Sequence, residues 1–443
     1  MHRPRRLPSC LALAALLALA GPTSPLHAQD GGVDPADTSW VLVSTALVLL
    51  MTPGLAFFYG GLVRRKNVLS ILMQCFLCMS LMTVLWVAVG FSLAFAPDAL
   101  GGIVGGLDYA FLRGVGFEAW DGTTIPAQLF MLFQAMFAII TPALMVGAFA
   151  ERMRFSAMCW FSSLWLLLVY CPVAHWVWGG AEGFFGLGSD GALDFAGGTV
   201  VHINAGVAAL VAAILLGRRQ GYPSATSPPH NLPFAVLGTG LLWFGWFGFN
   251  AGSALAAGAS AVNAMVTTHL AAAAAALTWG AIEWVRHDRP TVLGVITGAV
   301  AGLVAITPAC GSVDALGALA VGVGASLASY LAVAWVKTRL GYDDSLDVFG
   351  VHGVAGVWGA LATGLFATAA TPGNDTNGLF HGNPMQALIQ LEAVVFTLVW
   401  SGVVSLALLK LISWAVPLRV GHDDERIGLD LTAHREAAYT IVE

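Results

Sequence analysis

Two histidines lie in matching glycine-rich segments, and their setting suggests what this chain does. The segments read DFAGGTVVHINAG, from Asp194 through His202, and DVFGVHGVAG, from Asp347 through His352. At about 1.5 Å of helix rise per residue, each imidazole is predicted to lie roughly 8 to 12 Å inside a bilayer core about 30 Å thick. Ionisable groups are costly at that depth and usually mark a permeation path.

The chemistry that two such imidazoles support is hydrogen bonding to a small neutral amine. A cation in an apolar pore pays several kcal/mol or more of desolvation, whereas imidazoles in the same setting stay uncharged and still offer hydrogen bonds. Packing histidines are the alternative, but the repeated context argues against it. A metal site is a second alternative, and no thiolate or carboxylate cluster accompanies the histidines at ligand spacing.

Composition defines the class of protein. Hydrophobic residues make up 58% of the chain, charged residues make up 10%, and the mean hydropathy is +0.79. These values exclude a soluble globular protein and predict a polytopic membrane protein. We find no constellation of nucleophile, metal or cofactor, so we predict no enzyme, no cofactor and no nucleic-acid partner.

The first 28 residues resemble a secretory signal peptide. Arg3, Arg5 and Arg6 precede an apolar run from Cys10 to Ala20, and Leu26-His27-Ala28 offers a small-residue cleavage site. The apolar run is too short to span a bilayer as a retained helix. We therefore predict a signal peptide over 1–28, a periplasmic segment over 29–39, a transmembrane domain over 40–417 and a cytoplasmic tail over 418–443.

Eleven apolar spans are predicted in the transmembrane domain. They cover about 40–60, 68–95, 127–149, 156–177, 198–216, 232–251, 262–284, 291–309, 316–336, 348–366 and 386–416. With the N-terminus outside, fifteen of the sixteen lysines and arginines after residue 28 fall on the cytoplasmic side, and only Arg113 falls outside. The positive-inside rule therefore predicts N-out, C-in topology in a bacterial inner membrane.

The histidine segments fall in the fifth and tenth spans, which predicts two five-helix halves. An odd number of helices per half makes the second half insert upside down, so the two histidines approach the midplane from opposite faces. The predicted fold class is an all-α polytopic membrane protein with eleven transmembrane helices and an inverted five-helix repeat.

Several segments, in the right order from about Trp40 to Tyr439, closely resemble the Amt/Mep/Rh ammonium transporter family, in particular its bacterial Amt branch. They are FYGGLVRRKNVLS, FQAMFAIITPALMVGAFAERMRFSA, AHWVWGG, DFAGGTVVHINAG, WFGWFGFNAGSA, DDSLDVFGVHGVAG and DDERIGLDLTAHREAAY. The resemblance implies the family's channel fold, assembly as a homotrimer in the lipid bilayer, and ammonium or ammonia as the substrate.

Residue roles also follow from the resemblance. It implies an outer ammonium recruitment site at Trp178, Phe137 and Ser253, where aromatic faces and a hydroxyl hold the cation. Phe137 and Phe249 match the stacked phenylalanines that close the outer mouth of the pore, and His202 and His352 match the twin histidines inside it.

Other ionisable residues in or near the spans need a separate assignment. Asp194 precedes Gly197, where a carboxylate could satisfy loose amides at a helix start or favour deprotonation of the substrate. Asp347 is expected to act in the same way for the tenth span. His269 and Glu392 lack counterparts in the other half and are expected to be satisfied contacts within the bundle.

The tail from Leu418 has two interpretations. A polar terminus after Pro417 could be disordered. The resemblance implies instead an ordered collar, carried by Glu425, Arg426, Gly428, Leu429 and Asp430, that couples subunits and receives a PII-type signalling protein. Arg435 stands where the family more often has glycine. A sensor that signals through this tail is the alternative function.

Overall fold

The computed structural model describes residues 32–180, 183, 191–224 and 228–439. The predicted signal peptide lies outside these residues. Among the described residues the chain is helical, with three isolated β-bridges and no β-strand.

Within the described residues, eleven apolar helical segments cross the molecule in the predicted order. They are α2 (Pro35–Leu62), η2 to α4 (Arg65–Phe95, including α3, Val68–Leu85), α5 (Ala127–Phe149), α6 to α7 (Phe155–Trp178), η7 with α8 (Gly198–Leu216), α9 (Leu232–Gly252), α10 (Ala259–His287), α11 (Val292–Ile306), α12 to α13 (Ala315–Leu340), η9 with α14 (Phe349–Phe366) and α15 (Pro384–Ala415). Ten are long and apolar enough to span a membrane, and α11 is shorter, with 15 residues. α2 begins five residues before the predicted span, at Pro35.

Local sequence explains where several helices begin. Asp34, Asn231, Thr291 and Asp314 each accept a hydrogen bond from a backbone amide in the first turn of the helix that follows. Proline follows Asp34 and lies in the first turn after Asn231, where its missing N–H costs nothing. The helix starts are therefore encoded by short polar motifs even though the helix interiors are almost uniformly apolar.

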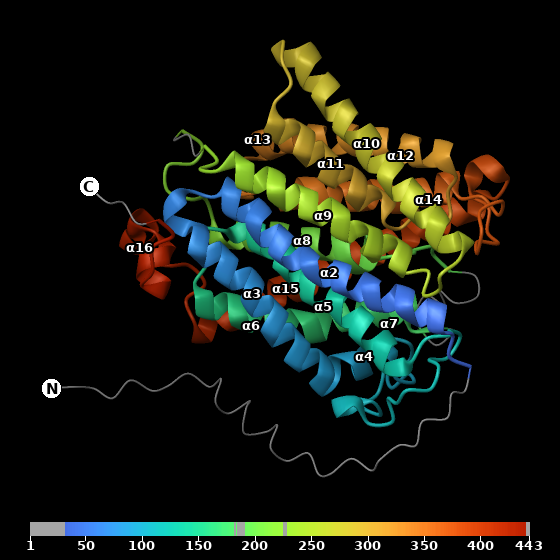
Figure 1. Cartoon of the computed structure of the whole chain (residues 1–443). Coiled ribbons are helices and arrows are strands. Elements are labelled where there is room, and N and C mark those ends of the chain that lie inside the picture. Colours follow the sequence, from blue (N-terminus) through green and yellow to red (C-terminus); the bar gives the residue numbers. More distant parts are fainter. Residues whose placement is uncertain (1–31, 181–182, 184–190, 225–227, 440–443) are drawn as a thin grey trace.

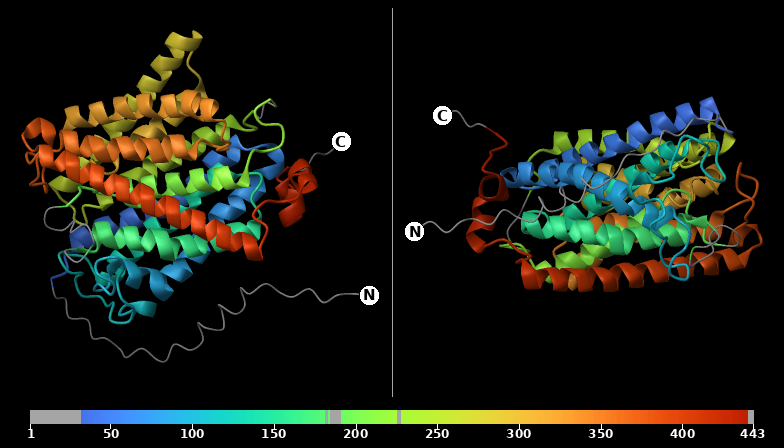
Figure 2. Two further views of the ribbon diagram at one scale, coloured as in Figure 1. Left: turned by 180° about the vertical axis from the view of Figure 1, so that it is seen from behind. Right: turned by 90° about the horizontal axis from the view of Figure 1, so that it is seen from below.

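The helices run roughly parallel to one another, and the short tail helix α16 (His422–Ile427) lies at one end of the bundle (Figures 1 and 2). The first helices of the two halves, α2 and α9, lie side by side (Figure 1). The fifth helices of the two halves also pack on each other, because α8 contacts η9 and α14 contacts η7. α5 is almost entirely buried beside them. This packing brings the two histidine segments together in the core.

Candidate functional site

Both histidines lie in π-helical turns at the beginning of their spans. His202 belongs to η7 (Gly198–Ile203) and His352 to η9 (Phe349–Gly353). A π-helical turn inserts an extra residue and re-aims the side chains around it, and such turns are frequent at functional sites. The sequence periodicity gave no sign of these turns.

The two imidazoles are in direct contact. Their Nδ1 atoms lie 3.3 Å apart, the ring centroids are 5.4 Å apart, and the rings are inclined by 24°. The side chains are buried, with 1% exposure for His202 and 3% for His352. One Nδ1 must carry the proton that the other accepts, so the pair holds at most one doubly protonated ring. The Nε2 atoms of the two rings are therefore the atoms available to hydrogen-bond a solute.

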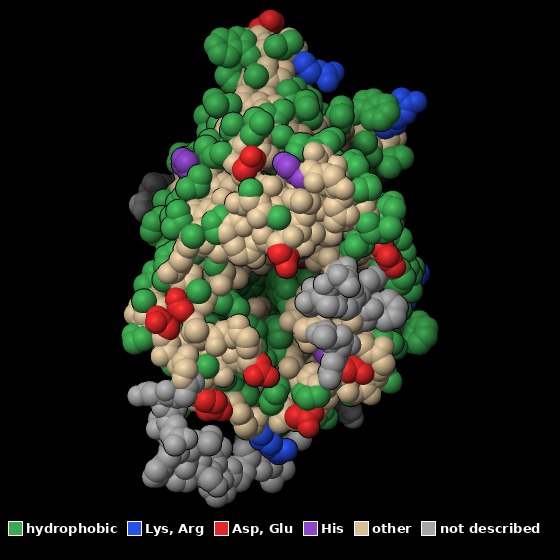
Figure 3. Space-filling view, turned by 90° about the vertical axis from the view of Figure 1, so that its right-hand side faces the viewer, with side chains coloured by type: hydrophobic (Ala, Val, Ile, Leu, Met, Phe, Trp, Pro, Cys, Tyr) green, Lys and Arg blue, Asp and Glu red, His purple; other side chains and the backbone are tan. Residues whose placement is uncertain are grey.

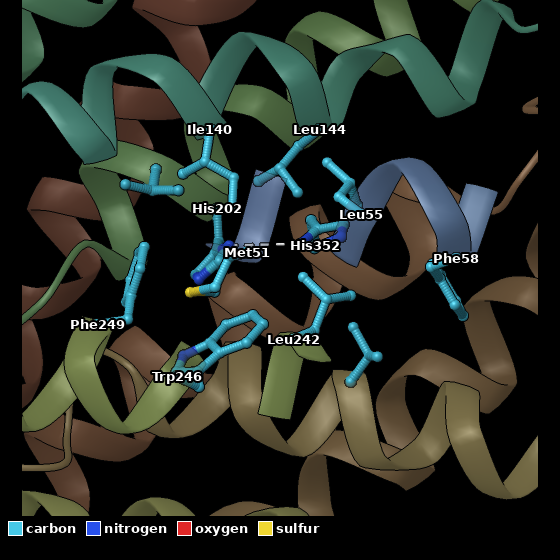
Figure 4. Close-up of a pocket in the computed structure, with 12 residues that line it drawn as sticks. Met51, Leu55, Phe58, Ile140, Leu144, His202, Leu242, Trp246, Phe249 and His352 are labelled. Carbon is cyan, nitrogen blue, oxygen red and sulfur yellow. Dashed lines mark hydrogen bonds between the residues drawn. The ribbon is translucent and has the colours of Figure 1, made fainter. Parts of the chain in front are cut away.

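A narrow cavity of about 10 Å³ surrounds the pair, which is close to the least space that admits one water-sized molecule. Apart from the imidazoles, its lining is apolar or aromatic: Met51, Leu55, Phe58, Ile140, Leu144, Val201, Leu242, Trp246, Phe249 and Val300. Figure 4 shows His202 nearer Phe249 and His352 nearer Phe58. Among the described residues, His202 Nε2 has no hydrogen-bond partner.

Trp246 forms one wall of this cavity, and the sequence analysis did not single it out. Its ring lies 5.5 Å from the His202 ring at an angle of 21°, and its Nε1 donates to the Thr307 hydroxyl at 2.9 Å. Trp246 lies one helical turn before Phe249 on α9, so both rings face the same side. That spacing was a signal that could have found it.

The end of the cavity near Phe249 is closed by aromatic rings. Phe137 and Phe249 are fully buried, with centroids 4.3 Å apart, and Trp178 meets Phe137 edge-on at 5.8 Å. The Ser253 hydroxyl donates to the Phe249 carbonyl at 2.8 Å, which leaves its oxygen lone pairs available as acceptors. The structure thus brings Phe137, Phe249 and Trp178 together, with Ser253 one turn beyond Phe249.

A wider cavity of about 460 Å³ lies beyond Trp178, lined by Tyr109, Glu118, Trp120 and Asp121 among others. Figure 3 shows the face on which α2 begins hollowed at its centre, with hydrophobic side chains deep in the hollow and acidic side chains around it. A third cavity, of about 420 Å³, is lined by Phe58, Asp347 and His352. The narrow histidine cavity therefore lies between two wider ones.

Asp194 caps the helix that carries His202. Its carboxylate accepts hydrogen bonds from the amides of Gly197 at 2.8 Å, Gly198 at 2.5 Å and Thr199 at 2.8 Å, and from the Thr199 hydroxyl. Gly197 has a φ of 115°, a conformation that favours glycine. The carboxylate is thus fully engaged in holding the start of η7.

Asp347 does not repeat this arrangement, and our expectation for it needs correction. Asp344 accepts the Phe349 amide at 2.8 Å, whereas the Asp347 carboxylate pairs with Lys337 at 2.6 Å. Asp344, like Asp194, lies eight residues before its histidine, which is the spacing that matches the two halves. Burial raises the pKa of Asp344 to about 6.

His269 and Glu392 also differ from expectation. Both are exposed on the surface of this chain rather than satisfied inside the bundle. The His269 ring lies 5.4 Å from that of Trp243 and 6.2 Å from that of Phe247. The Trp243 indole N–H has no acceptor among the described residues.

A buried ionic network, which the sequence analysis missed, joins the loops at the end opposite to the hollowed face. Glu151 pairs with Arg64 at 2.7 Å and with Arg219 at 3.3 Å, and Arg219 also pairs with Asp343 at 2.8 Å. Burial alone would raise the pKa of the Glu151 carboxyl, but hydrogen bonds and charge from Arg64 and Arg219 hold that pKa below its usual value. Burial alone would also raise the pKa of the Asp343 carboxyl, but hydrogen bonds and charge from Arg219 hold that pKa below its usual value.

The tail is docked on loops of its own chain. Glu425 accepts the Gln220 amide and a guanidinium N–H of Arg419, both at 2.7 Å. The Leu429 amide donates to the Asn67 side chain at 2.8 Å. Beyond these contacts, Asp430 accepts the Ser70 amide at 2.8 Å, and burial raises the pKa of its carboxyl. Residues 418–439 are therefore ordered, which argues against the disordered interpretation.

Gly428 and Arg426 are the remaining two residues of the predicted tail motif. Gly428 has a φ of 116°, and a Cβ there would meet Lys66 at 2.6 Å, so this turn requires glycine. Arg426 is 69% exposed and meets Asp423 at only 3.4 Å. Arg426 is thus the member of the predicted motif that is most free to meet a partner.

The helical fold and the narrow transport lane, which is the cavity past His202 and His352, define a multi-pass membrane transporter for a small solute. A model of the Ammonium Transporter Family matches residues 39–439, and the chain belongs to this family. It is 49% identical over 404 residues to an ammonium transporter of Bacillus subtilis (strain 168), covering 91% of this chain and 98% of that protein. It is 45% identical over 413 residues to ammonium transporter Amt1 of Archaeoglobus fulgidus, covering 93% of this chain and 100% of that protein.

Solved structures agree with this assignment. The crystal structure of Saccharomyces cerevisiae Mep2 superposes with a TM-score of 0.81 at 36% identity, covering 88% of this chain and 89% of that chain. A structure described as a sensor Amt protein superposes with a TM-score of 0.83 at 29% identity, covering 90% of this chain and 98% of that chain. The chain functions in ammonium transport across a membrane and is not an enzyme.

Proposed function

We propose that ammonium is recruited outside at Trp178, Phe137 and Ser253, loses its proton near the Phe137–Phe249 gate, and passes the twin histidines as ammonia. The observation that carries this route is the histidine cavity: its walls are apolar or aromatic, and its polar side chains are two buried imidazoles, for which desolvation favours the uncharged form. A charged ion there would pay a desolvation penalty of several kcal/mol or more, whereas ammonia pays far less and finds hydrogen-bonding partners. The cavity of about 420 Å³ past His352 has room for the water that reprotonation needs.

Variants of the two histidines test this route. We expect His202→Ala and His352→Ala to insert and fold but to lose selective ammonium transport in liposomes, measured as uptake and as current over a range of ammonium and pH. Wild-type uptake, selectivity and current in both variants would contradict the assigned lane. The same recordings decide whether transport carries net charge.

Topology and location form a second part of the proposal: a bacterial inner membrane with the N-terminus periplasmic and the tail cytoplasmic. The basic residues near the tail support this orientation, because lysine and arginine gather on the cytoplasmic side of membrane proteins. A fluorescent protein fused after Glu443 should be bright, and alkaline phosphatase at the same position should be inactive. The reverse result would invert the topology.

Assembly as a homotrimer is supported by the exposed His269 and the unpartnered Trp243 N–H. His269 is the eleventh residue of α10, about 15 Å from the helix end, a depth at which polar groups in lipid are costly. A protein surface there would supply partners. In native mass spectrometry, His269→Leu should weaken the trimer. If His269→Leu leaves the trimer unchanged, this face is not the interface.

The docked tail supports regulation by a PII-type protein. Arg426 projects from an ordered platform, so Arg426→Glu should abolish nucleotide-dependent co-purification with the organism's own PII-type protein, as should truncation after Leu418. Retention of that protein by both variants would place docking on other inner loops. The sensor alternative is less favoured, because the relatives in Bacillus subtilis and Archaeoglobus fulgidus are named ammonium transporters, whereas one of the similar solved structures is described as a sensor Amt protein.

A further inference from the structure

A groove outside the transport lane lies between the end of α8 and the end of α13 (Lys337–Leu340). It has a volume of about 660 Å³, within the range of small-molecule sites. Leu210, Ala213 and Ile214 form one wall, and Val336 and Leu340 form the other. Ile214 is 59% exposed and Leu340 is 71% exposed, so the groove opens outward rather than into the bundle.

Arg218 stands at the rim of this groove without a compensating carboxylate. Its Nε donates to the Gly341 carbonyl at 2.7 Å, which fixes the guanidinium. Asp343 also lines the groove, but its carboxylate is taken by Arg219 at 2.8 Å. Among the described residues, Arg218 forms no ion pair within 4 Å. Arg339, one residue before Leu340, is exposed and rests on the Trp335 ring.

The groove lies at the membrane boundary on the side of the tail. α8 and α13 are the ends of membrane spans, and Arg218 follows directly after α8. No described residue of the chain's own tail lines the groove, and the described part of the tail is held elsewhere by Asn67, Ser70 and Gln220. A groove of this kind presents hydrocarbon contacts within the bilayer and a positive charge at headgroup level.

We propose that this groove binds one anionic phospholipid of the leaflet on the tail's side. An acyl chain lies between the walls formed by Ile214 and Leu340, and the phosphate meets Arg218. Basic pockets between helices on the cytoplasmic side are suited to such headgroups. A free inorganic anion would satisfy Arg218 but would leave the apolar walls uncovered.

A ligand in the groove contacts the segment that carries His352 through one residue, Phe349. Phe349 lines the groove and is also the first residue of η9, the turn that carries His352. The Tyr342 ring packs edge-on against Phe349 at 6.4 Å. A bound acyl chain therefore packs against the segment that positions His352, and it should stabilise the folded protein.

The test compares phosphatidylglycerol with phosphatidylcholine of the same acyl chains, using native mass spectrometry and the unfolding midpoint of the purified full-length protein in detergent. Wild type should prefer phosphatidylglycerol by roughly fivefold, the contribution expected of one arginine near the headgroups. Arg218→Gln should lose this preference, and Arg218→Lys should keep it. Ile214→Trp, which fills the groove, should weaken binding of both lipids.

Two matched controls and one competing ligand make the test decisive. Arg113→Gln, on the hollowed face, and Val399→Trp, at a 59% exposed position of α15, should behave as wild type. Inorganic phosphate at the same concentration should neither raise the unfolding midpoint nor displace the lipid. An unchanged lipid preference in Arg218→Gln together with unchanged binding in Ile214→Trp would overturn the proposal, and displacement by phosphate would replace the lipid with a free anion.

Discussion

Gly206 lies directly against Gly353: a Cβ added to Gly206 would meet the Cα of Gly353 at 2.4 Å. Gly206 is four residues after His202, and Gly353 is next to His352. The other half repeats the relationship, since a Cβ on Gly356, four residues after His352, would meet the Cβ of His202 at 3.2 Å. The glycine of each His-x-x-Ala-Gly motif therefore permits the close crossing of the helices that carry the two histidines.

The first prediction concerns this crossing. Gly206→Ala should separate the helices, break the 3.3 Å contact between the imidazoles and lower stability by about 1 to 3 kcal/mol, because backbone atoms cannot give way. Gly356→Ala should have a smaller effect, since its nearest contacts are at 3.0 to 3.2 Å. Ammonium uptake and the unfolding midpoint measure both effects.

Gly240→Ala on α9 is the control for this series, because a Cβ there meets nothing within 4 Å. If Gly206→Ala transports and unfolds like Gly240→Ala, the close crossing is not required.

Trp246 sets the width of the histidine cavity. Trp246→Leu should enlarge the space beside His202 and admit methylammonium more readily relative to ammonium. A change of about 1 kcal/mol in size discrimination, or roughly fivefold in the uptake ratio, is expected for such a loss of bulk. Trp414→Leu, at an exposed position, is the control. An unchanged uptake ratio in Trp246→Leu would show that this ring does not limit the lane.

The outer site is tested by affinity. Trp178→Leu combined with Ser253→Ala should raise the apparent half-saturating ammonium concentration roughly fivefold or more, since cation–π and hydroxyl contacts contribute about 0.5 to 2 kcal/mol each. Trp160→Leu with Ser413→Ala, both exposed, is the matched control pair. Equal half-saturation in the two double variants would remove Trp178 and Ser253 from recruitment.

The Glu151 network predicts a pH-dependent stability. Because the folded-state pKa of Glu151 is held below its ordinary value of 4.5, the ionised carboxylate contributes stability above that pH, and the contribution is lost as pH falls through the folded pKa. Glu151→Gln should therefore be less stable than wild type at pH 7, by on the order of 2 kcal/mol.

The difference between wild type and Glu151→Gln should shrink as the pH falls below about 4, where the wild-type carboxylate also becomes neutral. Unfolding midpoints of both proteins in detergent, taken from pH 7 to pH 3.5, provide the measurement. A difference that is constant over this range would mean that the charge of Glu151 is not what stabilises the loops.

The membrane class and the order of eleven helical spans could be predicted from the sequence, and the sequence also singled out the two histidine segments that the structure brings into contact. These features follow from local composition: apolar runs long enough to span a bilayer, polar capping residues, and motifs repeated in both halves. The likeness to the ammonium transporter family also marked Trp178, Phe137, Phe249 and Ser253 from short segments.

The three-dimensional packing, and not the local sequence, determines which distant residues come into contact. The contact between Nδ1 atoms, the stacking of Trp246 on His202 and the ion pair of Arg64 with Glu151 join residues 150, 44 and 87 positions apart. The choice of Asp344 over Asp347 as the cap depended on the backbone path and on Lys337. Apolar periodicity carries no information on such pairings, because in a membrane helix it does not distinguish a lipid-facing side chain from one that lines a lane between helices.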